Sequence, residues 1–87
     1  MYTKQQFGKE LKEQMLKNKT SEEIGAWSIV VYYARLFEMD TKLGLLLLQL
    51  GAMEEGYQFE RSYEELNDIA DRLIAGEDVE LWKSRFN

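Results

Sequence analysis

Cysteine, histidine and proline are all absent from this chain of 87 residues. Without cysteine and histidine the protein forms neither a disulfide framework nor a Cys/His zinc site, and it lacks the side chains of thiol and histidine catalysis. The six glycines are scattered singly, so there is no glycine-rich phosphate loop. No motif places a serine or threonine beside an activating base. We therefore expect no enzyme activity, no cofactor and no metal.

Long hydrophobic runs are also scarce. The N-terminus is polar and charged, unlike the apolar core of a secretory peptide. The apolar stretch Leu43–Met53 ends at Glu54 and is shorter than the about twenty residues needed to cross a bilayer. Arg35 interrupts a second apolar stretch, residues 24–37. We expect a soluble cytoplasmic protein that does not enter a membrane.

Four consecutive leucines, Leu45–Leu48, are the most informative feature that is present. Successive helical residues are about 100° apart, so four in a row cover every side of a helix. A helix that is apolar on all sides must be buried by its own chain or covered by another molecule. We therefore expect a Leu-rich helix at the centre of the domain, out of reach of water on every side.

Helix start and stop signals divide the chain clearly. Capping boxes or an N-cap residue predict helices that begin at Thr3, Thr20, Asp40 and Ser62. The predicted ends lie near Asn18, Met39, Gly56 and Gly76. Asp78 would cap a short last helix that carries Val79, Trp82 and Phe86. The sequence thus predicts an all-α fold, a compact bundle of four to five short helices in a single domain spanning residues 1–87.

The second and third predicted helices are both apolar on nearly all sides. Residues 29–33 have strand propensity, and residues 57–63 could pair with them, which leaves a β alternative open. A lone pair of strands is marginally stable, and the capping box at Thr20 favours the helix. Gly44 and Gly51 lie two turns apart on one side, where they would let another backbone approach closely. Either these two helices form a central hairpin wrapped by the others, or part of their surface is shared with another molecule. We favour a compact bundle in which part of the second or third helix is available for association.

Charge is unevenly distributed along the chain. Residues 1–20 carry five lysines and two glutamates, a net of +3, whereas residues 21–87 carry six basic and fourteen acidic groups, a net of −8. The acidic body repels phosphate, which argues against nucleic-acid binding. The basic first segment could contact an acidic partner or lie against the acidic surface of the chain itself.

Acidic residues occur in adjacent pairs that could bind a cation or act as acid and base. Most of these pairs fall at predicted helix starts, where carboxylates interact favourably with the helix dipole. The groups are Glu22 with Glu23, Glu54 with Glu55, Glu64 with Glu65, and Glu77 and Asp78 with Glu80. None has the ligand spacing of a calcium loop, so we interpret them as surface and capping residues.

Three functions agree with these observations. The leading hypothesis is a small acidic, non-catalytic protein-interaction domain, such as an inhibitor, immunity factor or regulatory adaptor, that binds a basic protein partner. The first alternative is a homodimer or assembly component that associates through the Leu-rich helix. The second is a nucleic-acid-binding regulator that uses the lysines of the first helix. The predicted partner-binding residues are Glu54, Glu55, Tyr57, Phe59, Glu64 and Glu65.

Overall fold

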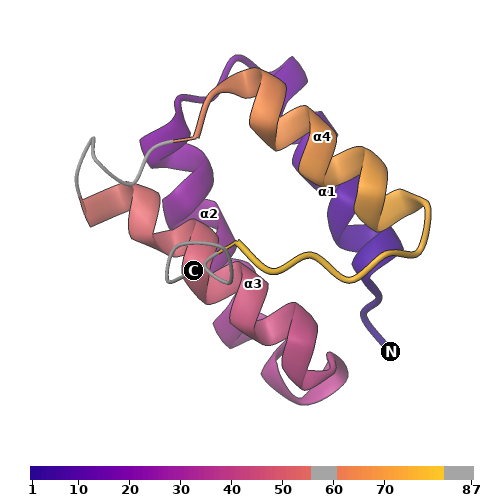
Figure 1. The fold of residues 1–87 in the computed structure, drawn as a ribbon. Helices are drawn as coiled ribbons and strands as arrows, with labels where there is room; N and C mark the ends of the chain where they lie inside the picture. Colours follow the sequence, from indigo (N-terminus) through magenta and orange to yellow (C-terminus); the bar gives the residue numbers. More distant parts are fainter. Residues whose placement is uncertain (56–60, 82–87) are drawn as a thin grey trace, which may run out of the picture.

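The computed structural model describes residues 1–55 and 61–81 and is helical almost throughout these ranges (Figure 1). The elements in chain order are α1 (Lys4–Leu16), α2 (Ser21–Ala34), the 3₁₀ helix η1 (Leu36–Glu38), α3 (Thr41–Gly51), the 3₁₀ helix η2 (Ala52–Glu55) and α4 (Tyr63–Ile74). The described chain contains no strand, and residues 29–33 belong to α2. The all-α prediction is confirmed, and the β alternative for residues 29–33 is wrong.

The four helix starts predicted at Thr3, Thr20, Asp40 and Ser62 are confirmed by their hydrogen bonds. In α1 the Gln6 N–H donates to Thr3 Oγ1 and the Thr3 N–H donates to Gln6 Oε1, both at 3.1 Å. Thr20 with Glu23 and Ser62 with Glu65 form the same reciprocal box. The Asp40 carboxylate caps α3 by accepting the Leu43 N–H at 2.8 Å. Each box satisfies backbone donors that a helix otherwise leaves unpaired.

The predicted helix ends agree with the structure less well than the starts. Gly76 does terminate α4, in the left-handed conformation at φ 94°. However, α2 ends at Ala34 rather than near Met39, because the chain turns there into η1. The α-helix of α3 ends at Gly51 and continues as η2, while the predicted stop at Gly56 lies outside the described residues.

The prediction that Asp78 caps a fifth helix is wrong, since residues 77–80 are not helical. The physical reason is that two ammonium groups bind the Asp78 carboxylate instead, Lys4 Nζ at 2.8 Å and Lys42 Nζ at 3.4 Å. The segment after α4 therefore crosses from the α1–α4 side of the molecule to α3 (Figure 1). Trp82 and Phe86 lie outside the described residues.

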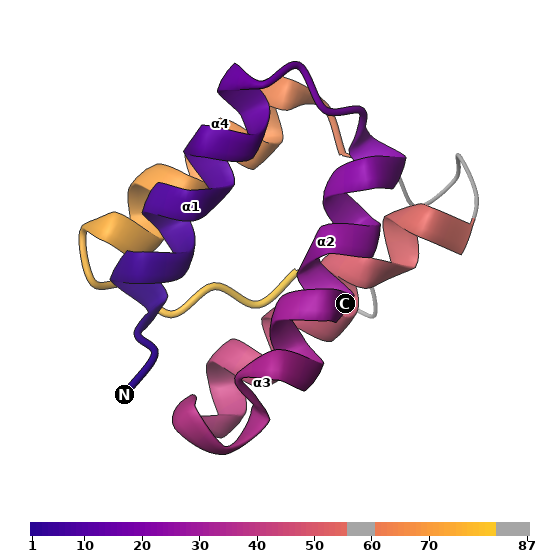
Figure 2. The ribbon, with the colours of Figure 1, turned by 180° about the vertical axis from the view of Figure 1, so that it is seen from behind.

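The helices are arranged as two pairs, α1 beside α4 and α2 beside α3 (Figure 2). Glycine allows both pairs to approach closely. A Cβ added to Gly8 of α1 would lie 2.9 Å from the Ala70 carbonyl oxygen of α4, and one added to Gly51 of α3 would overlap the Ile29 side chain of α2. At Gly44 and Gly51 the groups that approach closely are the side chains of Tyr32 and Ile29 of α2, whereas the prediction was for a backbone.

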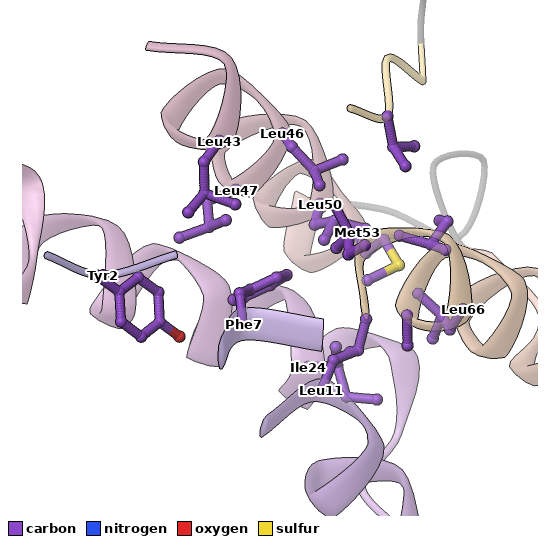
Figure 3. Close-up of a cluster of buried hydrophobic side chains, with 14 residues drawn as sticks. Tyr2, Phe7, Leu11, Ile24, Leu43, Leu46, Leu47, Leu50, Met53 and Leu66 are labelled. Atoms are coloured by element: carbon purple, nitrogen blue, oxygen red, sulfur yellow. The ribbon is translucent and has the colours of Figure 1, made fainter. Parts of the chain in front are cut away.

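The hydrophobic core fills the space between the two pairs (Figure 3). Among the described helices, α3 contributes the most buried residues, and in that sense it is the central helix of the core. Phe7 is fully buried and stacks on the Trp27 ring, with 5.1 Å between centroids. The core residues labelled in Figure 3 are Tyr2, Phe7, Leu11, Ile24, Leu43, Leu46, Leu47, Leu50, Met53 and Leu66.

The four consecutive leucines divide into a buried and an exposed half. Leu46 and Leu47 are buried, whereas Leu45 is 54% exposed and Leu48 is 40% exposed. The prediction that water reaches this helix from no side is therefore wrong. The reason is that α1 and α4 cover only one flank of the α2–α3 hairpin, which forms one side of the domain instead of being wrapped (Figure 2).

The basic first segment binds acidic groups of its own chain. Lys4 pairs with Asp78, and Lys12 pairs with Asp71 of α4. Two of the five N-terminal lysines are thus used within the fold, in agreement with one of the two alternatives for this segment. Each such exposed ion pair contributes little to the stability of the fold, roughly 0–1 kcal/mol.

We expect the capping boxes to make stability pH-dependent. Backbone hydrogen bonds from Thr20 and Ser62 hold the pKa of Glu23 and of Glu65 below the ordinary value. A lowered pKa in the folded state gives a stabilisation that is present above the ordinary glutamate pKa of about 4.3 and is lost as pH falls through the folded-state pKa. Urea unfolding between neutral pH and about pH 3 measures this loss.

The variant Glu23→Gln/Glu65→Gln should lose less stability on acidification than the parent. Glutamine keeps the reciprocal bond, as Gln6 does in α1, but it does not titrate. Glu22→Gln/Glu64→Gln, which removes two neighbouring carboxylates outside the boxes, is the matched control. If Glu23→Gln/Glu65→Gln lost as much free energy of unfolding on acidification as the parent, this assignment would be contradicted.

Candidate interaction surfaces

The structure describes four of the six residues predicted to bind a partner, and two of these four line a common groove. Glu64 and Glu65 are exposed in the first turn of α4 and line one groove. Glu54 and Glu55 are exposed in η2 and do not line it. Tyr57 and Phe59 lie outside the described residues. The part of the site that the structure brings together is thus the acidic start of α4.

This groove, called the charged groove below, lies between α4 and the segment that follows it and has a volume of about 350 Å³. Its apolar part is formed by Ile69, Val79 and Leu81, of which the first two are buried. The charged residues that line it are Arg61, Glu64, Glu65, Asp68, Arg72 and Glu80. The groove therefore combines an apolar base with a charged rim.

The basic groups of the rim are already paired. Arg61 lies 3.5 Å from Glu65, and Arg72 lies 3.1 Å from Glu77 and 4.0 Å from Asp68. In contrast, Glu64 and Glu80 form no ion pair with residues 1–55 or 61–81. Four carboxylates against two guanidinium groups leave the lining with a net charge of −2. The groove is therefore suited to a positively charged group.

A second groove, called the apolar groove below, opens where α2, η1 and α3 meet. Its volume is about 200 Å³. Gly44 of α3 carries no side chain there, and the Tyr32 ring of α2 packs against it. Apart from Asp40, which caps α3, no charged residue lines this groove. The lining residues are Tyr32, Leu36, Met39, Asp40, Thr41, Gly44, Leu45 and Leu48.

Exposed apolar side chains extend the apolar groove onto the surface around it. Tyr33 of α2 is exposed and meets the Tyr32 ring edge to face, with 5.3 Å between centroids. Phe37 of η1 is 99% exposed, directly after Leu36 of the groove lining. Large exposed apolar areas on soluble proteins mark interaction sites. This surface is thus the second candidate for binding.

Sequence reasoning missed most residues of both grooves. Asp68 and Arg72 follow Glu64 at helical spacing, so a common face with Glu64 could have been recognised. Gly44 and Gly51 mark the face of α3 that contacts α2, and Leu45 and Leu48 lie on the flank beyond it. Glu80 stands out in the sequence only as part of an acidic group with Glu77 and Asp78, and the fold of the segment after α4 brings it to the groove.

Within the described ranges no three Asp or Glu residues are grouped so that they could hold a metal ion. No helix in this part of the chain has the length and apolar character needed to span a membrane. No family model matches the sequence, and the comparisons with curated proteins and with solved structures found no match either. The two grooves are therefore the features from which a function can be argued.

Proposed function

We propose that this chain is a small acidic, non-catalytic interaction domain that binds a basic segment of a partner protein in the charged groove. The observation that carries the proposal is an apolar base bordered by more carboxylates than the neighbouring guanidinium groups neutralise. An inhibitor, immunity factor or regulatory adaptor would act through a surface of this kind and leave the chemistry to its partner.

A long basic side chain fits both parts of the charged groove. Lysine and arginine pack their aliphatic stems on apolar surface while the charged head stays near water and counter-charge. Here the stem would lie along Ile69 and Leu81, and the head would meet the carboxylates of Glu64 and Glu80. The net charge of −5 would also speed the encounter with a basic partner.

The nucleic-acid alternative has less support. Its binding surface would be the lysines of the first helix, and Lys4 and Lys12 already pair with Asp78 and Asp71. A protein that binds DNA through phosphate contacts needs such cations free to neutralise the backbone.

We expect the charged groove to select basic peptides. The probe is an array of Lys- and Arg-rich peptides, each paired with a counterpart in which the basic residues are replaced by glutamate. Peptides retained on the array are then titrated by calorimetry against the parent and against Glu64→Lys/Glu80→Lys. Reversing two carboxylates should weaken binding at least about tenfold, and added salt should weaken parental binding.

The matched control is Glu13→Lys/Glu22→Lys, which changes the net charge equally at exposed positions outside the groove. Its affinity should stay close to that of the parent. Equal losses in both variants would show that total charge decides binding and would contradict a specific groove. Glu54→Lys/Glu55→Lys tests the remaining predicted pair, and a loss there would extend the site to η2.

A further inference from the structure

We infer that a second copy of this chain covers the apolar groove, with Phe37 of each copy inserted into the groove of the other. This surface is separate from the charged groove, so the inference goes beyond the proposed function. Three properties of the apolar groove and its surroundings indicate that a second copy covers it: the shape of the surface, the volume of the groove and the local charge.

The surface offers both a projecting side chain and a groove. Phe37 projects from η1 with 99% of its surface exposed, so it does not fill the groove of its own chain. The preceding residue, Leu36, lines the groove. In a two-fold contact the same surface of each copy meets the other, so Phe37 of each copy would enter the groove of its partner. Such a contact closes at two copies and leaves neither Phe37 exposed.

The volume suits an aromatic ring. An apolar cavity of about 150 Å³ binds benzene, and the apolar groove offers about 200 Å³. Its walls are aromatic and aliphatic, from Tyr32, Met39, Leu45 and Leu48. Aromatic side chains that fill apolar pockets are typical anchors of protein interfaces.

The charge favours a second copy over a basic partner. Residues 24–53, which contain α3, η1 and most of α2, carry Arg35 and Lys42 against Glu38 and Asp40, a net of zero. The remainder of the chain therefore carries the whole net charge of −5. Two acidic molecules repel each other less across this neutral face than across the acidic parts of the surface. A basic partner gains no net attraction from it.

Sedimentation equilibrium from about 1 μM to about 1 mM protein tests the inference, since this range spans firm to weak association. We expect a monomer–dimer equilibrium in the parent. Phe37→Ser and Leu45→Glu should each raise the dissociation constant at least about tenfold. Leu16→Glu, which changes an exposed apolar residue at the end of α1, should leave it unchanged. Phe37 makes no buried contact in its own chain, so Phe37→Ser retains the fold, as circular dichroism would check.

Isotope-filtered NMR on mixed labelled and unlabelled protein should show contacts between the Phe37 ring of one copy and the Leu48 methyl groups of the other. A monomer throughout the concentration range would overturn the inference, as would a dimer that Phe37→Ser and Leu45→Glu do not weaken. Glu64→Lys/Glu80→Lys should leave the dimer intact. Failure of the dimer and failure of the charged groove are thus measured separately.

Discussion

Replacement of Phe7 by alanine should lower the free energy of unfolding by about 3–5 kcal/mol, the cost of removing a buried phenylalanine side chain. Phe7 is fully buried and joins α1 to α2 by stacking on Trp27. Loss of the aromatic pair adds roughly 0.5–1.5 kcal/mol. A domain of this size is stable by only about 4–13 kcal/mol, at roughly 0.05–0.15 kcal/mol per residue. We therefore expect Phe7→Ala to be partly unfolded at 37 °C.

Urea unfolding followed by circular dichroism and by Trp fluorescence measures this loss. Phe7→Leu is the matched control, because it keeps most of the apolar volume and removes only the ring contact. Phe7→Leu should lose clearly less free energy of unfolding than Phe7→Ala. A loss below about 1 kcal/mol in Phe7→Ala would contradict the packing of Phe7 between α1 and α2 described above.

Among the four consecutive leucines, Leu47→Ala should lower the free energy of unfolding by about 2–5 kcal/mol. Leu45→Ala should lower it by about 1 kcal/mol or less. Leu47 is fully buried between the helix pairs, and its removal leaves a cavity. Leu45 is more than half exposed, so its loss changes little of the core. Chemical denaturation of both variants at low protein concentration, where self-association does not contribute, gives the comparison.

Leu48→Ala is expected to resemble Leu45→Ala, and Leu46→Ala to resemble Leu47→Ala, because the exposed and buried residues lie on opposite flanks of α3. Equal losses at all four positions would mean that all sides of this helix are covered in solution. That outcome would contradict the exposed flank on which the apolar groove depends.

Local structure followed closely from the sequence. The capping boxes at Thr3, Thr20 and Ser62 each join residues only three positions apart, so the information needed to start a helix is local. The Asp40 cap and the Gly76 stop depend equally on near neighbours. The end of α2 was harder to predict from the sequence. Leu36 and Phe37 continue the apolar pattern, although the chain turns at Arg35.

The candidate site was predicted only in part. Glu64 and Glu65 were identified by their place at a helix start, which is a local property. The groove they line depends on Val79 and Glu80, which are brought alongside α4 by the segment that Asp78 ties to Lys4 and Lys42. Contacts with such wide separation in sequence leave no periodic signal.

By itself, the sequence determined four of the five predicted helix starts, the all-α class and the absence of cysteine and histidine chemistry, because each depends on residue type or on neighbours within one or two turns. Only the tertiary structure decided which flank of each helix is covered. Leu45–Leu48 are identical in chemistry, yet two are buried and two are exposed, since a helix has several sides and its neighbours cover only some of them. That choice is made by packing between distant segments, and both proposed binding surfaces follow from it.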